Sequence, residues 1–221
     1  MFIGHYALAF GAKRAAPAVS LGTLFLACQF ADLLWPTLVL LGIEAVEVAP
    51  GITAVTPLNF VRYSYSHSLV MLLVWSALFA VSYLVLRGRH QAAAITLAAL
   101  VFSHFVLDFI THRPDLPITV GGATRVGLGL WNAPAIVLPL ELLMLAAGIG
   151  IYMKTTRARD RIGRISLWAL AAFLFLVHLA NFFGPPPPSA AAVAWSAQAL
   201  WLVVAWGYWI DKHRTTHLMK G

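Results

Sequence analysis

The stretch QAAAITLAALVFSHFVLDFITH, residues 91–112, is apolar enough to cross a membrane, yet it carries ionisable side chains toward its end. A helix that spans a bilayer needs about 20 apolar residues. His104 and Asp108 are four residues apart, so they share one helix face. An ionisable group at such a depth usually faces a partner, a water-filled cavity or a metal. We therefore expect a membrane-spanning helix with a functional polar face.

Other apolar segments lie on both sides of this one. Of the 221 residues, 61% are hydrophobic and 10% charged, and the mean hydropathy is +0.82. A soluble domain of this size cannot bury so much apolar surface. The sequence predicts an all-α, polytopic membrane helix bundle that forms a single integral membrane domain over residues 1–221. The apolar segment 2–12 is too short to cross alone and predicts a half-spanning or interfacial helix. Full spans are expected near 17–42, 66–86, 91–111, 129–152, 165–183 and 190–210.

Basic residues favour one side of these spans. The connections on the other side contain only Arg62, Arg113 and Arg125. Loops rich in Lys and Arg stay in the cytoplasm, which predicts a cytoplasmic C-terminus in a multi-pass protein of a bacterial-type inner (plasma) membrane. This placement also accounts for the net charge of +7 without direct nucleic-acid binding. The basic side carries Lys13, Arg14, Arg87, Arg89, Lys154, Arg157, Arg159, Arg161, Arg164, Lys212, Arg214 and Lys220.

Two further features limit the possibilities. The first residues, MFIGHYALAF, lack a basic region and a small-residue cleavage site, so we do not expect a cleaved signal peptide. Cys28 is the only cysteine, which excludes intrachain disulfides and a cysteine-built metal site. The long connections 43–65 and 112–128 are too irregular for helices, and the stretch GPPPPS predicts a stiff turn between the last two spans.

Ionisable residues from four spans are predicted to share one level in the outer half of the membrane. At about 1.5 Å of rise per residue, each lies about 20–22 Å from the cytoplasmic anchor of its own span. These four residues are Asp32, His104, Glu141 and His178. By the same rise, a second set lies about 5–10 Å further out. It comprises His67, Asp108, His112 and Asn181.

Histidine and aspartate without cysteine suit zinc, and also manganese or iron. A catalytic metal keeps one position for water, which it activates near neutral pH. We expect a mononuclear divalent-metal centre, with zinc favoured and with His104 and Asp108 as its core. The remaining ligands are expected to be His67, Asp32 and His5. His5 can take part only if residues 1–12 are enclosed by protein or lie beside a wet cavity, because bare amides are not tolerated in lipid.

Other polar residues have simpler alternatives. Glu141 and His178 are candidates for a general base or for partners that orient the ligands. Glu141 can equally be a protonated structural acid, and His178 a hydrogen-bonding group between helices. His67 and His112 stand at span ends, where polar residues are common. The histidines of the cytoplasmic basic segments are expected to be solvated; they are His90, His213 and His217.

The order of these motifs resembles a known family. The motifs are Gly4–His5, ADLLWP with Asp32 and Pro36, SHSL from Ser66 to Leu69, and HFVLD from His104 to Asp108. They resemble the YdjM-like membrane-bound metal-dependent hydrolases, also described as LexA-binding, inner-membrane-associated hydrolases. The resemblance covers roughly residues 1–115, whereas the C-terminal three-helix part, 129–211, lies outside it. It implies that His5, Asp32, His67, His104 and Asp108 form the polar site.

The chain departs from the family pattern at two places. The family motif Pro-Asp-x-Asp corresponds here to the residues around Asp32, where the second carboxylate is missing. The family motif His-Arg-x-x-Thr-His-Ser corresponds to the residues leading up to His67 and Ser68, where Val61 or Tyr63 stands in place of a ligand, depending on the alignment. The resemblance therefore implies fewer metal ions, or weaker catalysis, than in a member that keeps both motifs.

Three functions remain open at this level. The first is a metal-dependent hydrolase that acts near the outer face on a lipid, a phosphoester or an envelope intermediate, with membrane lipids as its surroundings. The second is a non-enzymatic membrane subunit or scaffold, in which the polar cluster specifies helix packing or an ion path. The third is a b-type haem protein with His104 and His178 as axial ligands.

Overall fold

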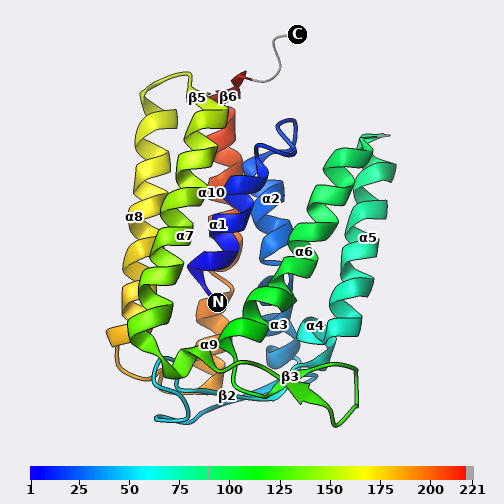
Figure 1. Ribbon diagram of the computed structural model, residues 1–221, viewed down its shortest axis with the longest axis vertical. Coiled ribbons are helices and arrows are strands. Elements are labelled where there is room, and N and C mark those ends of the chain that lie inside the picture. Colours follow the sequence, from blue (N-terminus) through cyan, green and yellow to red (C-terminus); the bar gives the residue numbers. More distant parts are fainter. Residues whose placement is uncertain (89, 218–221) are drawn as a thin grey trace.

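Long apolar helices make up most of the structure, which is a computed structural model (Figure 1). Within the described residues, 1–88 and 90–217, five helical stretches are long and apolar enough to cross a membrane. They are α5 (Leu69–Arg87), α6 (Gln91–Thr111), α7 (Pro134–Thr155), α8 (Arg161–Phe183), and the pair α9 (Ala190–Ala197) and α10 (Leu200–Lys212) taken together. This confirms a mostly helical fold whose helices are apolar enough to cross a membrane several times, which is consistent with a multi-pass membrane protein. Two of the basic residues expected on the cytoplasmic side, Arg89 and Lys220, lie outside the described residues.

A sixth candidate span is bent. The sequence predicted one span over 17–42, and the structure divides it into α2 (Leu21–Cys28) and α3 (Phe30–Leu40), which meet at an angle of 58°. Gln29, with φ −104° and ψ 10°, ends α2. The last carbonyls of a helix have no intrahelical partner. The break therefore leaves the carbonyl of Cys28, in the last turn of α2, available to a side chain from another helix.

The short N-terminal helix α1 (Ile3–Ala12) lies inside the bundle, where it packs against α7, α2 and α6 (Figure 1). Its side chains Ile3, Tyr6 and Phe10 are all completely buried. Gly148 of α7 permits the close approach, because a Cβ at this position would collide with the carbonyl of Ala7. Residues 1–12 are thus enclosed by protein, the condition that His5 requires to reach a buried site.

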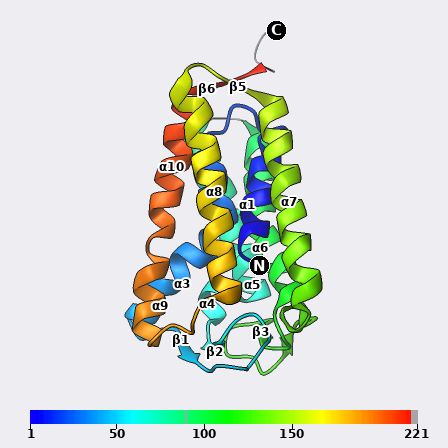
Figure 2. The ribbon, with the colours of Figure 1, turned by 90° about the vertical axis from the view of Figure 1, so that its left-hand side faces the viewer.

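The two ends of the bundle carry different connections (Figure 2). At the upper end lie the short hairpin of β5 (Thr156–Ala158) and β6 (Arg214–Thr216), and the basic connections predicted for the cytoplasm. The lower end carries the two long connections, which form small antiparallel hairpins. Their elements are β1 (Ala45–Val48), β2 (Leu58–Arg62), the short helix α4 (Ser64–His67), β3 (Leu116–Pro117), β4 (Arg125–Val126) and the 3₁₀ turn η1 (Leu130–Asn132).

Candidate metal centre

One face of α6 supplies the centre of a polar cluster. His104 and Asp108 are both buried on this face, and Nε2 of His104 lies 3.2 Å from Oδ2 of Asp108. His112 follows one turn later, immediately after α6 ends, and its Nε2 lies 3.8 Å from the same oxygen. Three ionisable side chains at a spacing of four residues therefore line one side of a single helix end.

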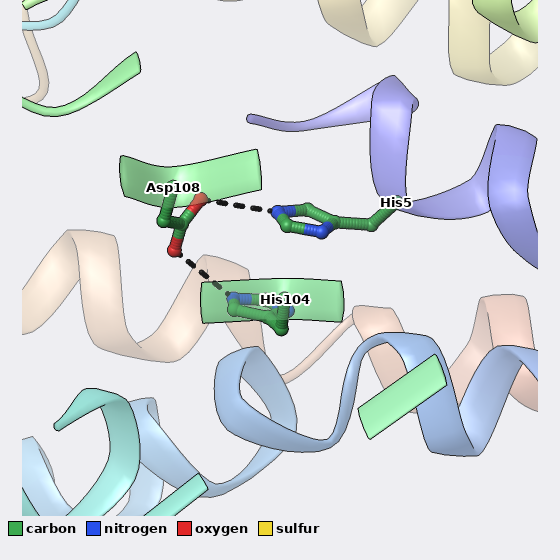
Figure 3. Close-up of side chains that lie close together, drawn as sticks. All are labelled: His5, His104 and Asp108. Carbon is green, nitrogen blue, oxygen red and sulfur yellow. Dashed lines mark hydrogen bonds and ion pairs between the residues drawn. The ribbon is translucent and has the colours of Figure 1, made fainter. Parts of the chain in front are cut away.

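Three further elements bring side chains to this face. His5 of α1 places Nε2 3.2 Å from Oδ1 of Asp108, and its ring stacks on that of His104 with the centroids 3.8 Å apart (Figure 3). His67 of α4 places Nε2 3.3 Å from Oδ1 of Asp32 of α3. That oxygen is also 3.7 Å from Nε2 of His104. The five residues expected at the site thus lie together, although their role as ligands stays a prediction.

The donor atoms form two overlapping groups with the spacing of metal ligands. In each group one atom per residue lies within 4.8 Å of the others; the groups are His5 with His104 and Asp108, and His67 with His104 and Asp32. Buried groups of this kind can hold a metal ion. His104 belongs to both, and only its Nε2 faces the cluster. Since this nitrogen has one lone pair, the arrangement favours a single ion.

The bend between α2 and α3 fixes the proton on His104. Nδ1 of His104 lies 2.9 Å from the carbonyl oxygen of Cys28, which can only accept a hydrogen bond. Nδ1 therefore carries the proton and donates it to Cys28. Nε2 then presents a bare lone pair to Asp108 and Asp32, and this nitrogen is buried without a hydrogen-bond partner among the described residues.

A similar chain of contacts orients His67. Nδ1 of His67 lies 2.7 Å from the hydroxyl of Ser66, which donates to Oε2 of the buried Glu44 at 2.6 Å. The carboxylate is the stronger acceptor, so the hydroxyl proton points toward Glu44 and its oxygen accepts from His67. Glu44 is held in turn by the backbone amides of Tyr65 and Ser66. Nε2 of His67 is again left bare, facing the carboxylates of Asp32 and Asp108.

His112 is oriented by a carboxylate outside the cluster. Its Nδ1 lies 3.0 Å from Oδ1 of Asp115, so Nδ1 donates and Nε2 faces Asp108. Burial alone would raise the pKa of Asp115, but the hydrogen bond and charge of His112 more than offset it, with further bonds from Tyr63 and Arg113. The pKa of Asp115 is therefore lowered, and at neutral pH this carboxylate is an ionised acceptor for His112.

In their neutral forms, the three imidazoles thus point unprotonated nitrogens at two carboxylates. A lone pair that faces a negative oxygen is repelled by it unless a cation or a proton lies between them. Histidine ligands of metals are commonly fixed in this way, with the outer ring nitrogen donating to a carboxylate or carbonyl and the inner one free to bind. One positive group is already present, because the amino group of Met1 lies 2.5 Å from Oδ1 of Asp108. The three bare nitrogens lie nearest the other oxygen, Oδ2.

Glu141 and His178 lie beside this cluster in different surroundings. Oε2 of Glu141 accepts hydrogen bonds from the backbone amides of Phe2 and Gly4 at 3.0 and 3.1 Å. It thereby caps the N-terminus of α1, where a carboxylate is also favoured by the helix dipole. His178 is buried, its ring stacks on Phe2, and neither of its nitrogens has a partner among the described residues. Both residues line the cavity that reaches the cluster.

A cavity of about 730 Å³ connects the cluster to the lower end of the molecule. Asp32, His67, Asp108 and His112 form part of its wall. The side chain of Asp32 is 28% exposed, far more than those of the other cluster residues, so it is the acid that water reaches most easily. The site can therefore exchange solvent and ligands although its histidines are buried.

Some of these residues were not predicted as site residues. His112 was treated as a residue at a span end, although the repeat His104, Asp108, His112 at intervals of four was a signal for a common face. Glu44, Ser66 and Asp115 orient the histidines from the connecting segments. Only the position of Ser66 next to His67 hinted at such a role, because the other contacts depend on how the connections fold.

Comparisons with known proteins return no match to this chain among protein-family models, curated proteins or solved structures.

Proposed function

We propose that this protein is a membrane-embedded, metal-dependent hydrolase with a mononuclear centre built on His104 and Asp108. The observation that carries the proposal is the set of bare Nε2 atoms of His67, His104 and His112 directed at the carboxylates of Asp32 and Asp108. A cluster that serves only to pack helices gains by pairing each donor with an acceptor. With neutral imidazoles, the inner atoms of this cluster are acceptors facing acceptors, and a bound cation would pair them.

The distances support zinc as the ion. Zinc binds histidine nitrogen and carboxylate oxygen at about 2.0–2.2 Å in a tetrahedral arrangement, which separates neighbouring ligand atoms by about 3.3–3.6 Å. In the structure, Nε2 of His104 lies 3.2 Å from Asp108 and 3.7 Å from Asp32, and Nε2 of His67 lies 3.3 Å from Asp32. These atoms are already near the spacing of a tetrahedral site. His5 and His112 are the further candidates for the same ion, each within 4 Å of Asp108.

The chain's own residues supply the remaining parts of a hydrolytic site. A bound zinc ion would lower the pKa of water and polarise the substrate's phosphoryl or carbonyl oxygen. Glu141 and His178 line the cavity beside the cluster and are our candidates for the group that takes the proton from the attacking water. Cys28, Ser66 and Asp115 keep the histidine ring nitrogens in one tautomer through bonds to Nδ1. The cavity leaves room for the substrate beside them.

The membrane arrangement belongs to the same proposal. We place six full spans and the half-spanning α1 in a bacterial-type inner membrane, with the C-terminus in the cytoplasm, because the basic connections gather at one end. The cavity then reaches the opposite, outer side. This arrangement and the His/Asp set agree with the resemblance to the YdjM-like hydrolases.

The two other candidate functions have less support. A scaffold role would not require the histidine lone pairs to face the acids. A b-type haem would need open space in front of Nε2 of His104, but two carboxylates lie within 4 Å of this atom and the ring of His5 stacks at 3.8 Å on His104. His178, the second candidate axial ligand, lines the cavity and stacks on Phe2.

Hydrolysis of a simple activated substrate tests the proposal. Detergent-purified protein loaded with zinc should hydrolyse bis(p-nitrophenyl) phosphate, lose this activity on chelation and regain it when zinc is restored. His104→Ala and Asp108→Asn should each reduce the rate by at least about 100-fold, as expected when a metal ligand is lost. His213→Ala is the matched control and should keep the full rate, because His213 is paired with Asp160 in the hairpin region at the other end. Equal rates in wild type and His104→Ala would refute the proposal.

A further inference from the structure

The cavity beside the His/Asp cluster has two chemically different walls. The polar wall contains Asp32, His67, Asp108 and His112, and another part of the lining, the apolar wall, is made of hydrocarbon side chains. The apolar wall comes from two membrane-spanning helices; it comprises Phe173 and Val177 of α8 with Leu200 and Val203 of α10. A volume of about 730 Å³ greatly exceeds that of a water molecule, about 30 Å³. It falls within the range of pockets that hold organic ligands.

His178 indicates that a ligand with a hydrogen-bonding group occupies this cavity. The residue is 1% exposed, and both ring nitrogens lack a partner among the described residues. A buried polar group without a partner destabilises the fold, because it has lost its hydrogen bonds to water. His178 lines the cavity together with Asn181, and its ring is held between Phe2 and Phe182 with centroid distances of 6.4 and 4.8 Å. The helices thus hold an unsatisfied donor and acceptor in place next to the apolar wall.

The position of the cavity indicates where the ligand comes from. Its wall also includes the tip of the β1–β2 hairpin, at 50–58, and the prolines at 185–187, both at the lower end of the bundle. The cavity therefore extends from the level of the connecting segments into the depth of the spanning helices. A molecule that is polar at one end and apolar at the other matches this course, and membrane lipids are molecules of this kind.

We propose that the cavity binds a phosphate-bearing membrane lipid, with the phosphate at the His/Asp cluster, the chain along α8 and α10, and a polar group of the linkage hydrogen-bonded to His178. The contact of the phosphate with a metal rests on the proposed function. The carboxylates of Asp32 and Asp108 carry two negative charges that a divalent ion balances, so an anionic headgroup meets no net negative charge at these side chains. The proposed contacts of the lipid's hydrocarbon chain and of His178 do not depend on a bound metal.

Cysteine protection tests this proposal in the full-length protein. Leu200→Cys places a thiol on the apolar wall, whereas Leu202→Cys, two residues further along α10, places one on a residue that is 71% exposed on the bundle surface. The native Cys28 is fully buried, and protein without an added cysteine gives the background. Labelling by a membrane-permeant maleimide is followed with dodecyl phosphate and with inorganic phosphate. At about ten times its Kd, a bound ligand should slow labelling of Leu200→Cys about ten-fold.

The expected pattern is protection of Leu200→Cys by dodecyl phosphate but not by inorganic phosphate, with Leu202→Cys unaffected by either. His178→Phe keeps a planar ring but removes both nitrogens, and should weaken the affinity for a diacyl phosphatidic acid, which carries linkage esters, by about five- to ten-fold. His213→Phe should leave this affinity unchanged. Absence of protection, equal protection of both cysteines, or protection by inorganic phosphate alone would overturn the proposal.

Metal content measured on the same samples separates the two proposals. Protection in a protein that binds no metal would support the lipid site and refute the metal-dependent function. A zinc-loaded, hydrolytically active protein without protection by dodecyl phosphate would refute the lipid site and leave the hydrolase proposal standing.

Discussion

Two buried polar clusters lie at the two ends of α1, and they differ in whether their hydrogen-bonding groups are satisfied. At its start is the His/Asp cluster, which consists of His5, Asp32, His67, His104, Asp108 and His112. Just beyond its end is the Lys13 cluster, which consists of Lys13, Tyr152 and Asp211.

Every charged group in the Lys13 cluster has a complementary partner. Nζ of Lys13 donates to Asp211 at 2.6 Å and to the carbonyl of Val19 at 2.7 Å. The second oxygen of Asp211 accepts from the hydroxyl of Tyr152 at 2.9 Å. A closed arrangement of this kind joins α1, α7 and α10, and it leaves little capacity for a ligand.

The His/Asp cluster, in contrast, is open, which means that some of its hydrogen-bonding groups have no complementary partner among the described residues. Nε2 of His104 and Nδ1 of His5 are buried without partners among the described residues, and further nitrogens face carboxylates. Burial of polar groups alone therefore does not identify a functional site. What distinguishes the two clusters is that Nε2 of His67, His104 and His112 lie nearest Oδ2 of Asp108, the oxygen that the amino group of Met1 does not contact.

Metal removal should produce the largest difference between the clusters. A ligand present at about 1,000 times its Kd stabilises the folded protein by about 4 kcal/mol. A chelator should therefore lower the melting temperature of zinc-loaded wild type strongly, as followed by tryptophan fluorescence in detergent. The same treatment should leave His104→Ala unchanged. If the chelator does not change the melting temperature of the wild type, the His/Asp cluster, like the Lys13 cluster, holds no stabilising metal ion.

Removal of the acid from the closed cluster should destabilise the protein without removing the metal. Asp211→Ala leaves the buried ammonium of Lys13 unpaired, which should lower the free energy of unfolding by about 3 kcal/mol. The double variant Lys13→Met, Asp211→Leu should recover most of this loss. Denaturation in mixed micelles measures the stability, and zinc per folded chain should stay at the wild-type level. Loss of zinc in the double variant would show that the two clusters are coupled.

Ser66→Ala should weaken metal binding without abolishing it. The change removes the hydroxyl that links His67 to Glu44, and loss of a group that orients a metal ligand typically weakens affinity about 10–100-fold. Ser76→Ala is the matched control, because Ser76 is also buried but, among the described residues, its hydroxyl donates to the carbonyl of Leu72 in its own helix. Competition with a fluorescent zinc chelator measures both affinities. Equal affinities in the two variants would argue against a role of Ser66 in orienting His67.

The smallest effect is expected at the surface of the upper end. Asp160 accepts from the amide of Gly163 at the start of α8 and pairs with His213, and these contacts lower its pKa below the ordinary value of 3.8. A lowered folded-state pKa means that the contribution to stability is complete at neutral pH and is lost as the pH falls through and below this ordinary value. Asp160→Asn should therefore lower the melting temperature slightly at pH 7, and the difference should shrink toward pH 3. A difference in melting temperature between the two proteins that grows as the pH falls would contradict this pH dependence.

The membrane helices could be predicted from the sequence because their signal is local. Runs of about 20 apolar residues and the positions of Lys and Arg are read from neighbouring residues alone. The bend at Gln29 could not be predicted in this way, because apolar residues precede and follow Gln29. Without this bend the carbonyl of Cys28 would remain inside a helix. Its hydrogen bond with Nδ1 of His104 therefore could not be predicted either.

The candidate site was partly predictable for a related reason. His104 and Asp108 share a helix face, and Asp32 was placed at a similar depth by the helical rise alone. The orienting groups Glu44 and Asp115 come from connections whose hairpins depend on long-range packing. Glu141 was expected at the right level, but its contact with the start of α1 required knowledge of where that helix lies.

We propose that the His/Asp cluster binds one divalent ion, and elemental analysis of the purified protein measures this binding. Protein purified without chelators, exposed to zinc and then separated from unbound ion should contain about one zinc per chain in wild type and His213→Ala. His104→Ala and Asp108→Ala should contain about one tenth of this or less, since each removes a central ligand, while still inserting into the membrane. Full zinc content in both cluster variants, or no zinc in wild type, would contradict the account.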